Sequence, residues 1–145
     1  MKDAFGGILN LVFIIVFLLL VSGILALTVN YTKAFRMKNF VISAIEQYES
    51  YGCFDRASSY GDSSCRQKIK DSAESIGYHP VHLHCSAGYE STDSYFCYKE
   101  NQSESGKYYT IVTQVNIDIP IINRIMGLDF FQVHGDTRVI DTRFR

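Results

Sequence analysis

The longest apolar segment of the chain lies at its N-terminus and runs from Ala4 to Val29 without a charged residue. Its only strongly polar side chain is that of Asn10. About 20 helical residues cross the roughly 30 Å hydrocarbon core of a bilayer, so this segment is long enough to span it. In lipid, a helix is the only single-segment structure that satisfies its own backbone hydrogen bonds. The pattern therefore predicts a transmembrane helix in residues 1–29.

A cleaved secretory signal is the alternative interpretation of this segment. Such signals have an apolar core of about 7–15 residues, followed by a cleavage site of small residues. The apolar run is longer than such a core, and neither Val21-Ser22-Gly23 nor Leu25-Ala26-Leu27 is a good cleavage sequence. The sequence therefore favours a helix that is retained as a membrane anchor.

The helical pattern continues beyond the apolar segment. Between Tyr31 and Tyr51 there is no Pro and no Gly, and apolar residues recur at helical spacing. They form one stripe, which consists of Met37, Phe40, Val41, Ala44, Ile45 and Tyr48. We therefore expect one continuous helix from Asp3 to Ser50, with an amphipathic second half that ends near Gly52.

The second half of the chain changes to the alternating pattern of strands. Residues 107–118 give the strongest strand prediction, with Tyr109, Ile111, Thr113, Val115 and Ile117 on one face. Further strands are predicted at 81–85, 95–99 and 130–142, the last one bent at Gly135. A short helix is predicted at 65–76, ended by Gly77, and a helical turn at 121–127.

These elements predict an α+β domain over residues 30–145. Strands that follow each other pair antiparallel, and their common apolar face needs a cover. The stripe on the long helix is the available cover. We therefore expect a small antiparallel sheet packed on the helix, with Phe40, Ile45 and Tyr48 buried against it.

Composition excludes some function classes. The net charge is −1 and the basic residues are scattered, so the chain has no electrostatic footprint for nucleic acid. The sequence contains no GxSxG, HExxH, P-loop or GxGxxG motif. We therefore expect a protein that is not an enzyme and that has no cofactor.

The four cysteines lie outside the apolar segment, at Cys53, Cys65, Cys85 and Cys97. An even number of cysteines in a small membrane-tethered domain indicates two disulfides and an oxidising compartment. Three pairings are possible, and we favour Cys53–Cys65 and Cys85–Cys97 because each closes one local loop rich in turn residues. A zinc site would need CxxC-type pairs, which the spacing does not provide.

The charges beside the apolar segment point to the opposite orientation from the cysteines. Lys33, Arg36 and Lys38 follow the segment, whereas Lys2 precedes it and is partly offset by Asp3. The positive-inside rule would place the domain in the cytoplasm. We follow the cysteines, because these basic residues continue a helix rather than fill a loop, and we expect a single-pass protein of the cell membrane with an extracytoplasmic domain.

The layout resembles that of type IV pilin-like proteins, in which an apolar N-terminal helix continues into an amphipathic half that packs on an antiparallel sheet. Within that group the chain is most similar to TadE-like minor pilins or pseudopilins of tight-adherence pili and related export systems. The stretch from Thr110 to Ile140 carries the second likeness, with Pro120, Ile122, Gly127 and Arg138 where that pattern puts them. The resemblance implies a structural subunit whose partners are the lipid bilayer and other pilin-like or membrane subunits.

One departure from the pilin pattern concerns processing. Pilin-like signals carry a small residue at the cut and a Glu five residues into the mature chain. Gly6 or Gly7 offers the small residue, but no Glu stands in the apolar segment. Asn10 is the only polar group there that could act similarly, through a hydrogen bond to a neighbouring helix, although it could equally be a shallow interfacial residue.

Small residues in the anchor favour close approach of neighbouring helices. We expect assembly through Asn10 and Gly23, with Gly6, Gly7, Ser22 and Ala26 as further small positions. The alternative is a stand-alone bitopic protein, whose small extracytoplasmic domain binds a ligand or partner.

Three further groups of residues carry weaker signals. His82 and His84 lie on one face of a predicted strand and are candidates for a metal, but surface histidines are the default interpretation. Asp136 and Arg138 are expected to form an exposed ion pair. The tyrosines between Tyr89 and Tyr109 form either an adhesive surface or part of the strands.

Overall fold

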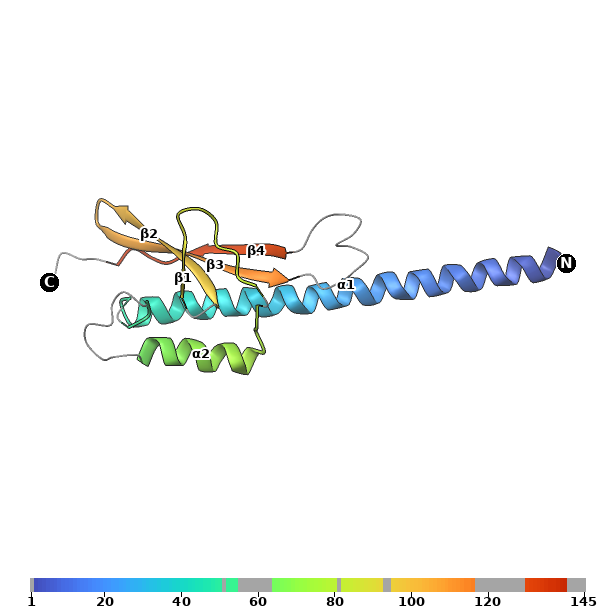
Figure 1. Cartoon of the computed structure of the whole chain (residues 1–145), viewed down its shortest axis with the longest axis horizontal. Helices are drawn as coiled ribbons and strands as arrows, with labels where there is room; N and C mark the ends of the chain where they lie inside the picture. Colours follow the sequence, from blue (N-terminus) through green and yellow to red (C-terminus); the bar gives the residue numbers. More distant parts are fainter. Residues whose placement is uncertain are drawn as a thin grey trace.

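In its described residues, the computed structural model of the chain has two helices and one four-stranded antiparallel sheet (Figure 1). It describes residues 2–50, 52–54, 64–80, 82–92, 95–116 and 130–140, with side chains from residue 6 onward. In chain order, the elements are α1 (Lys2–Gln47), α2 (Ser64–Ile76), β1 (Glu90–Thr92), β2 (Phe96–Ser103), β3 (Gly106–Asn116) and β4 (Phe130–Asp136). A long N-terminal helix packed on a small antiparallel sheet is the α+β arrangement that the sequence predicts.

Helix α1 is continuous, as predicted, and its N-terminal half extends away from the domain (Figure 1). It ends at Gln47, earlier than the predicted Ser50. Glu49 and Ser50 have left-handed φ angles of 48° and 69°, and Ser50 N donates to Ile45 O at 2.9 Å. This is the geometry of a helix C-cap, so the chain leaves the helix before it reaches Gly52.

Helix α2 ends where the sequence predicts, at Gly77. Gly77 has a φ of +68°, its N–H donates to Glu74 O, and Tyr78 N–H donates to Ala73 O. These two hydrogen bonds form a Schellman motif, which requires a left-handed residue that glycine adopts without strain.

The sheet is a meander in the order β1-β2-β3-β4, and every neighbouring pair is antiparallel. Strand β3 is central and matches the strongest strand prediction. Strand β2 continues through Ser103, beyond the end of the strand predicted at 95–99.

The predicted strand at 81–85 is wrong over its described residues 82–85. His84 N–H donates to the Gln114 side chain, and Gln132 Nε2 donates to His84 O. The backbone at His84 is therefore paired with side chains, and the apolar alternation there does not mark a ladder of strand hydrogen bonds. The first strand of the sheet is instead β1, which lies between the strands predicted at 81–85 and 95–99.

Several sequence predictions lie outside the described residues. They include the helical turn at 121–127 with Pro120, Ile122 and Gly127, and the final residues of the last predicted strand.

The C-terminal half of α1 is covered on two sides, by the sheet on one and by α2 on the other (Figure 1). This explains why so many of its side chains are buried: Ala34, Met37, Val41, Ala44 and Ile45. Helix α2 contributes Cys65, Ile69 and Ala73 to the same core at helical spacing. The sequence predicts the sheet as the cover of the stripe; the structure adds α2 as a second cover.

The three residues predicted to pack on the sheet differ in burial. Ile45 is completely buried, whereas Phe40 and Tyr48 are half-buried against the same core. Lys68 of α2 lies with its Nζ 5.5 Å from the centre of the Tyr48 ring, so part of Tyr48 faces α2 rather than the sheet.

Candidate functional site

The N-terminal half of α1 is the largest exposed apolar surface among the described residues. From Ile8 to Val29 most large apolar side chains are exposed, with Phe13 reaching 66%, whereas Val21 and Leu27 are half-buried. The helix is long and apolar enough to cross a membrane, and its most apolar window is not buried at all. It lies near the N-terminus, where a signal sequence has the same composition.

Hydroxyl groups in this half are satisfied within the helix. Ser22 Oγ donates to Leu19 O at 2.9 Å, and Thr28 Oγ1 donates to Ile24 O at 2.8 Å. Such bonds leave few polar groups that need water, which suits an apolar environment. The exposed Asn10 is different, because its side-chain amide makes no hydrogen bond with any described residue. Its donors and acceptor are available to a second helix.

The glycines near the N-terminus leave room on the helix surface. A Cβ added at Gly6 or Gly7 would meet nothing within 4 Å, and Gly23 is half-buried. Of the two predicted assembly positions, Asn10 is exposed and Gly23 is half-buried.

A polar contact fixes α1 to the sheet where the helix enters the domain. Thr113 of β3 is completely buried, and its Oγ1 donates to Ala34 O at 3.0 Å. Near the other end of the domain, Arg138 N–H donates to Glu46 Oε1 at 2.7 Å. The predicted Asp136–Arg138 pair is wrong: Asp136 accepts from Thr110 on the neighbouring strand, and the Arg138 guanidinium donates to Glu46 O.

Both predicted disulfide pairings are present. Cys53–Cys65 closes the connection between α1 and α2, and Cys85–Cys97 joins the segment before β1 to strand β2. Each bridge ties an irregular segment to a regular element of the domain.

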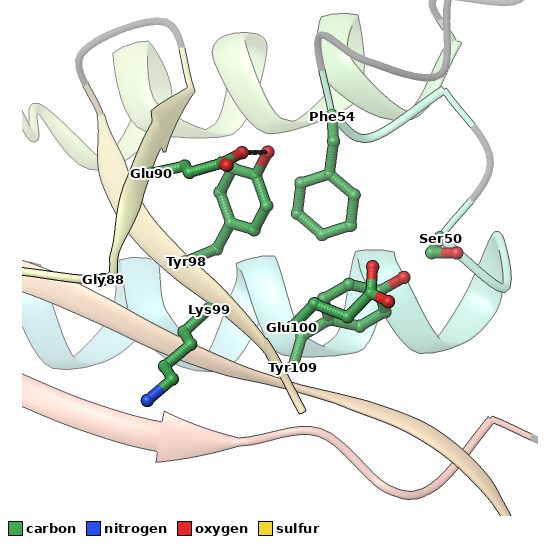
Figure 2. Close-up of a pocket in the computed structure, with 8 residues that line it drawn as sticks. All are labelled: Ser50, Phe54, Gly88, Glu90, Tyr98, Lys99, Glu100 and Tyr109. Carbon is green, nitrogen blue, oxygen red and sulfur yellow. Dashed lines mark hydrogen bonds between the residues drawn. The ribbon is translucent and has the colours of Figure 1, made fainter. Parts of the chain in front are cut away.

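A cavity of about 390 Å³ lies on the face of the domain between the end of α1 and strands β1 and β2 (Figure 2). Its apolar side consists of three buried aromatic rings. Phe54 stacks on Tyr98 with ring centres 4.2 Å apart, and its centre is 4.8 Å from that of Tyr109. The predicted tyrosine group is therefore core at Tyr98 and Tyr109, and their ring edges line the cavity.

Two carboxylates line the polar side of this cavity. Tyr98 OH donates to Glu90 Oε2 at 2.7 Å, while Lys99 points away from the rings (Figure 2). Glu100 accepts from Lys107 at 2.6 Å, and this hydrogen bond raises the pKa of Lys107. Carboxylates beside aromatic rings suit a cationic group. The sequence gives no spacing signal for this cavity, because its residues come from four separate segments.

A second, smaller cavity of about 170 Å³ lies where α1 enters the domain. It is lined by Asn30, Lys33, Gly77, Tyr78, His79, Pro80, Gln114, Val115 and Asn116. Tyr78 OH donates to Gln114 O, and Gln114 N–H donates to Tyr78 OH, both at 2.9 Å. Burial raises the pKa of Tyr78 to about 12.

The histidines do not assemble into a metal site within the described part of the chain. The rings of His82 and His84 are 6.5 Å apart and tilted, and His84 stacks on Phe130 at 5.5 Å. No group of three His, Cys, Asp or Glu side chains there is placed to hold a metal ion.

Comparisons of the chain with family models, with curated proteins and with solved structures found no match.

Proposed function

We propose that the chain is a membrane-anchored, pilin-like structural subunit of a pilus or of a secretion or export assembly. The observation that carries this proposal is the unbroken helix α1, whose first half is exposed and apolar and whose second half is the spine of the domain. A tether requires only a span and a linker. A continuous helix instead fixes the domain rigidly to the anchor, which suits regular packing of many copies.

The polar and small residues of the anchor support the same proposal. Asn10 offers an amide whose hydrogen bonds are unmade within the described chain, and Gly23 permits close approach of a second backbone. In this role the domain lies outside the cytoplasmic membrane, its two disulfides are structural, and no catalytic residue is required.

Site-specific crosslinking of the full chain in native membranes tests assembly. The four native cysteines are paired, so single cysteines placed at Asn10 and Gly23 are the only free thiols. We expect disulfide or bis-maleimide crosslinks at both positions, either between copies or to another small membrane protein. Val12 and Leu25, each about 200° around the helix from the tested position two residues before it, are the local controls at the same depth.

The pattern of crosslinks distinguishes assembly from random collision. A packed helix gives crosslinks with helical periodicity, whereas anchors that diffuse freely give weak crosslinks at all four positions. If Asn10 and Gly23 stay uncrosslinked at native expression while the protein remains functional, the assembly proposal fails.

The aromatic cavity favours a second candidate, a bitopic protein whose domain binds a ligand or partner. The carboxylates of Glu90 and Glu100 line this cavity, so it attracts a cationic group such as a basic side chain. This candidate predicts that Glu100→Gln abolishes function while crosslinking through the anchor is absent. A pilin-like subunit predicts that crosslinking is present and independent of Glu100.

A further inference from the structure

The end of the domain that faces the anchor brings together residues from three segments. Asn30 and Lys33 of α1 line the small cavity together with Val115 and Asn116, the last residues of β3. The register of the sheet pairs Asn116 with Phe130 and Val115 with Phe131. The start of β4 therefore lies at the level of residues 30–33 of α1, on the side of the sheet toward the anchor (Figure 1). We call Tyr31, Lys33, Phe130 and Phe131 the anchor-side end.

The anchor-side end lies close to the limit of the apolar segment. From Val29 to Lys33 the helix rises by about 6 Å, at 1.5 Å per residue. A bilayer of about 40–45 Å has a hydrocarbon core of about 30 Å, which leaves roughly 5–8 Å of headgroup layer on each side. Because α1 continues unbroken through this region, the anchor-side end is within reach of that layer.

Its side chains have the chemistry of a membrane interface. Tyr31 is 47% exposed, Phe130 37% and Phe131 40%. Aromatic rings with this much exposure in water lack the stabilisation that burial would give them. Aromatic side chains are enriched where a protein meets the headgroup level of a bilayer.

The charge of the same region is complementary to lipid phosphate. From Ala4 to Ile45 the chain contains three basic residues, Lys33, Arg36 and Lys38, and no acidic residue. Lys33 is half-buried beside the end of α2, where its Nζ would lie 3.6 Å from a Cβ built on Gly77. It is held in place by the fold rather than being free in solvent. Basic residues near a membrane surface are attracted to anionic headgroups.

The length of the apolar segment leaves its depth in the bilayer open. At 1.5 Å per residue it is about 39 Å long, which exceeds the hydrocarbon core. The helix therefore tilts or shifts along its axis, and interfacial aromatic and basic residues decide which. The anchor-side end carries both kinds of residue at one level.

We propose that the anchor-side end rests in the headgroup layer of the bilayer that α1 crosses. Tyr31, Phe130 and Phe131 lie in the interface, and Lys33 binds lipid phosphate. This inference rests on the membrane anchor in the proposed function. It also gives a reason for the basic residues Lys33, Arg36 and Lys38 next to the apolar segment, although the cysteines indicate that the domain lies outside the cytoplasm.

Tryptophan fluorescence of the full chain in vesicles tests this contact, because the protein has no Trp. Phe131→Trp places a single fluorophore at the anchor-side end. Val139→Trp is the matched control, since Val139 is 42% exposed and precedes Ile140, which bridges to Lys107 at the opposite end of the sheet. Phe17→Trp reports whether the helix is in the bilayer.

The vesicles contain phosphatidylcholine and phosphatidylglycerol. Part of the lipid is replaced by lipid that carries bromine on the acyl chain close to the headgroup, and this bromine quenches tryptophan fluorescence. We expect quenching and a blue shift of the emission for Phe131→Trp and for Phe17→Trp, but not for Val139→Trp. If Phe131→Trp is quenched no more than Val139→Trp, the docking proposal is overturned. Quenching at Phe17→Trp then shows that the anchor itself stands, and its absence overturns the anchor as well.

A charge variant tests the role of Lys33. In the Phe131→Trp background, Lys33→Gln should remove the additional quenching that phosphatidylglycerol gives over phosphatidylcholine alone. Lys99→Gln, at an exposed lysine that points elsewhere, should leave it unchanged. If Lys33→Gln has no effect, the phosphate contact assigned to Lys33 is wrong.

Discussion

The side chain of Tyr78 places a hydroxyl group against β3, where the hydroxyl makes two hydrogen bonds. It donates to Gln114 O and accepts from Gln114 N–H, so one side chain satisfies both backbone groups of a residue in the central strand. The connection after α2 is therefore tied to the sheet by a side chain.

Replacing Tyr78 with Phe should destabilise the domain. The substitution keeps the ring but leaves the two backbone groups of Gln114 buried and unpaired, which costs about 1–3 kcal/mol each at most. We expect the free energy of unfolding of the full chain in detergent to fall by about 2–6 kcal/mol, measured by denaturant titration. An unchanged free energy would mean that water or another group satisfies Gln114.

The pH dependence of stability has a defined sign at Tyr78. A free tyrosine ionises near pH 10, and burial raises the pKa of Tyr78 to about 12. The folded state therefore resists ionisation, and its stabilisation is present below pH 10 and is lost as the pH rises toward 12. A shift of this size corresponds to roughly 2–3 kcal/mol. The wild-type protein should lose more stability than Tyr78→Phe across this interval, so the difference between their unfolding curves isolates Tyr78 from other alkaline titrations.

Two glycines in the sheet should respond differently to alanine. A Cβ at Gly106 would lie 2.1 Å from the backbone O of Ile140, whereas one at Gly135 would meet the flexible ends of Lys38 and Ile42 at 2.8 and 2.9 Å. Side-chain ends can move, but Ile140 is paired with Lys107 through two backbone hydrogen bonds. We expect Gly106→Ala to cost about 1–3 kcal/mol through loss of this pair. Gly135→Ala should cost about 1 kcal/mol or less.

Thermal unfolding of the two glycine variants gives the comparison. Equal melting temperatures would show that the segment at Ile140 moves away without loss of stability.

At the scale of the elements, α1 has two environments along one helix. Its first half is exposed, whereas its second half lies between the sheet and α2. The sequence separates the halves by pattern, because the first is apolar on all sides and the second is amphipathic. Substitutions in the two halves should therefore have different effects on the domain.

Ile45→Ala should lower the free energy of unfolding by about 2–5 kcal/mol, because Ile45 is completely buried. Phe40→Ala should lower the free energy of unfolding by less than the roughly 2–5 kcal/mol expected for a completely buried side chain, since Phe40 is half-buried. Ile14→Ala, in the exposed half of α1, is the matched control and should leave the domain unchanged. Near-ultraviolet circular dichroism of the tyrosines in the full chain reports domain unfolding without the helix dominating the signal. Equal effects of Ile45→Ala and Ile14→Ala would contradict this packing.

At the scale of the molecule, the disulfides and the anchor together define the topology. Both bridges lie in the domain, and stable disulfides form in an oxidising compartment. In intact cells we expect all four cysteines to resist a membrane-impermeant maleimide until a reductant is added, and then to react from outside. Peptide mapping without reduction should give Cys53–Cys65 and Cys85–Cys97.

Free thiols in the native membrane, or a Cys53–Cys97 link, would contradict this topology. Labelling that appears only after the cells are opened would place the domain in the cytoplasm, as the positive-inside rule alone would.

The sequence by itself determined the features that depend on local periodicity. The apolar segment, the amphipathic half of α1, the alternation of β3 and the end of α2 at Gly77 each follow from residues close together in the chain. The cysteine pairing also follows from local loops. These features were sufficient for the fold class, because a sheet with one apolar face needs a helical cover.

Only the tertiary structure decided which partners meet across the chain. Strand β1 could not be predicted, because three residues carry too little periodicity and its pairing with β2 alone defines it. The failed strand at 82–85 has the right alternation, but the side chains of Gln114 and Gln132 occupy its backbone. The aromatic cavity and the anchor-side end likewise combine residues far apart in sequence. No local pattern encodes such contacts, since they depend on the register of β3 with β4 and on where α1 crosses the sheet.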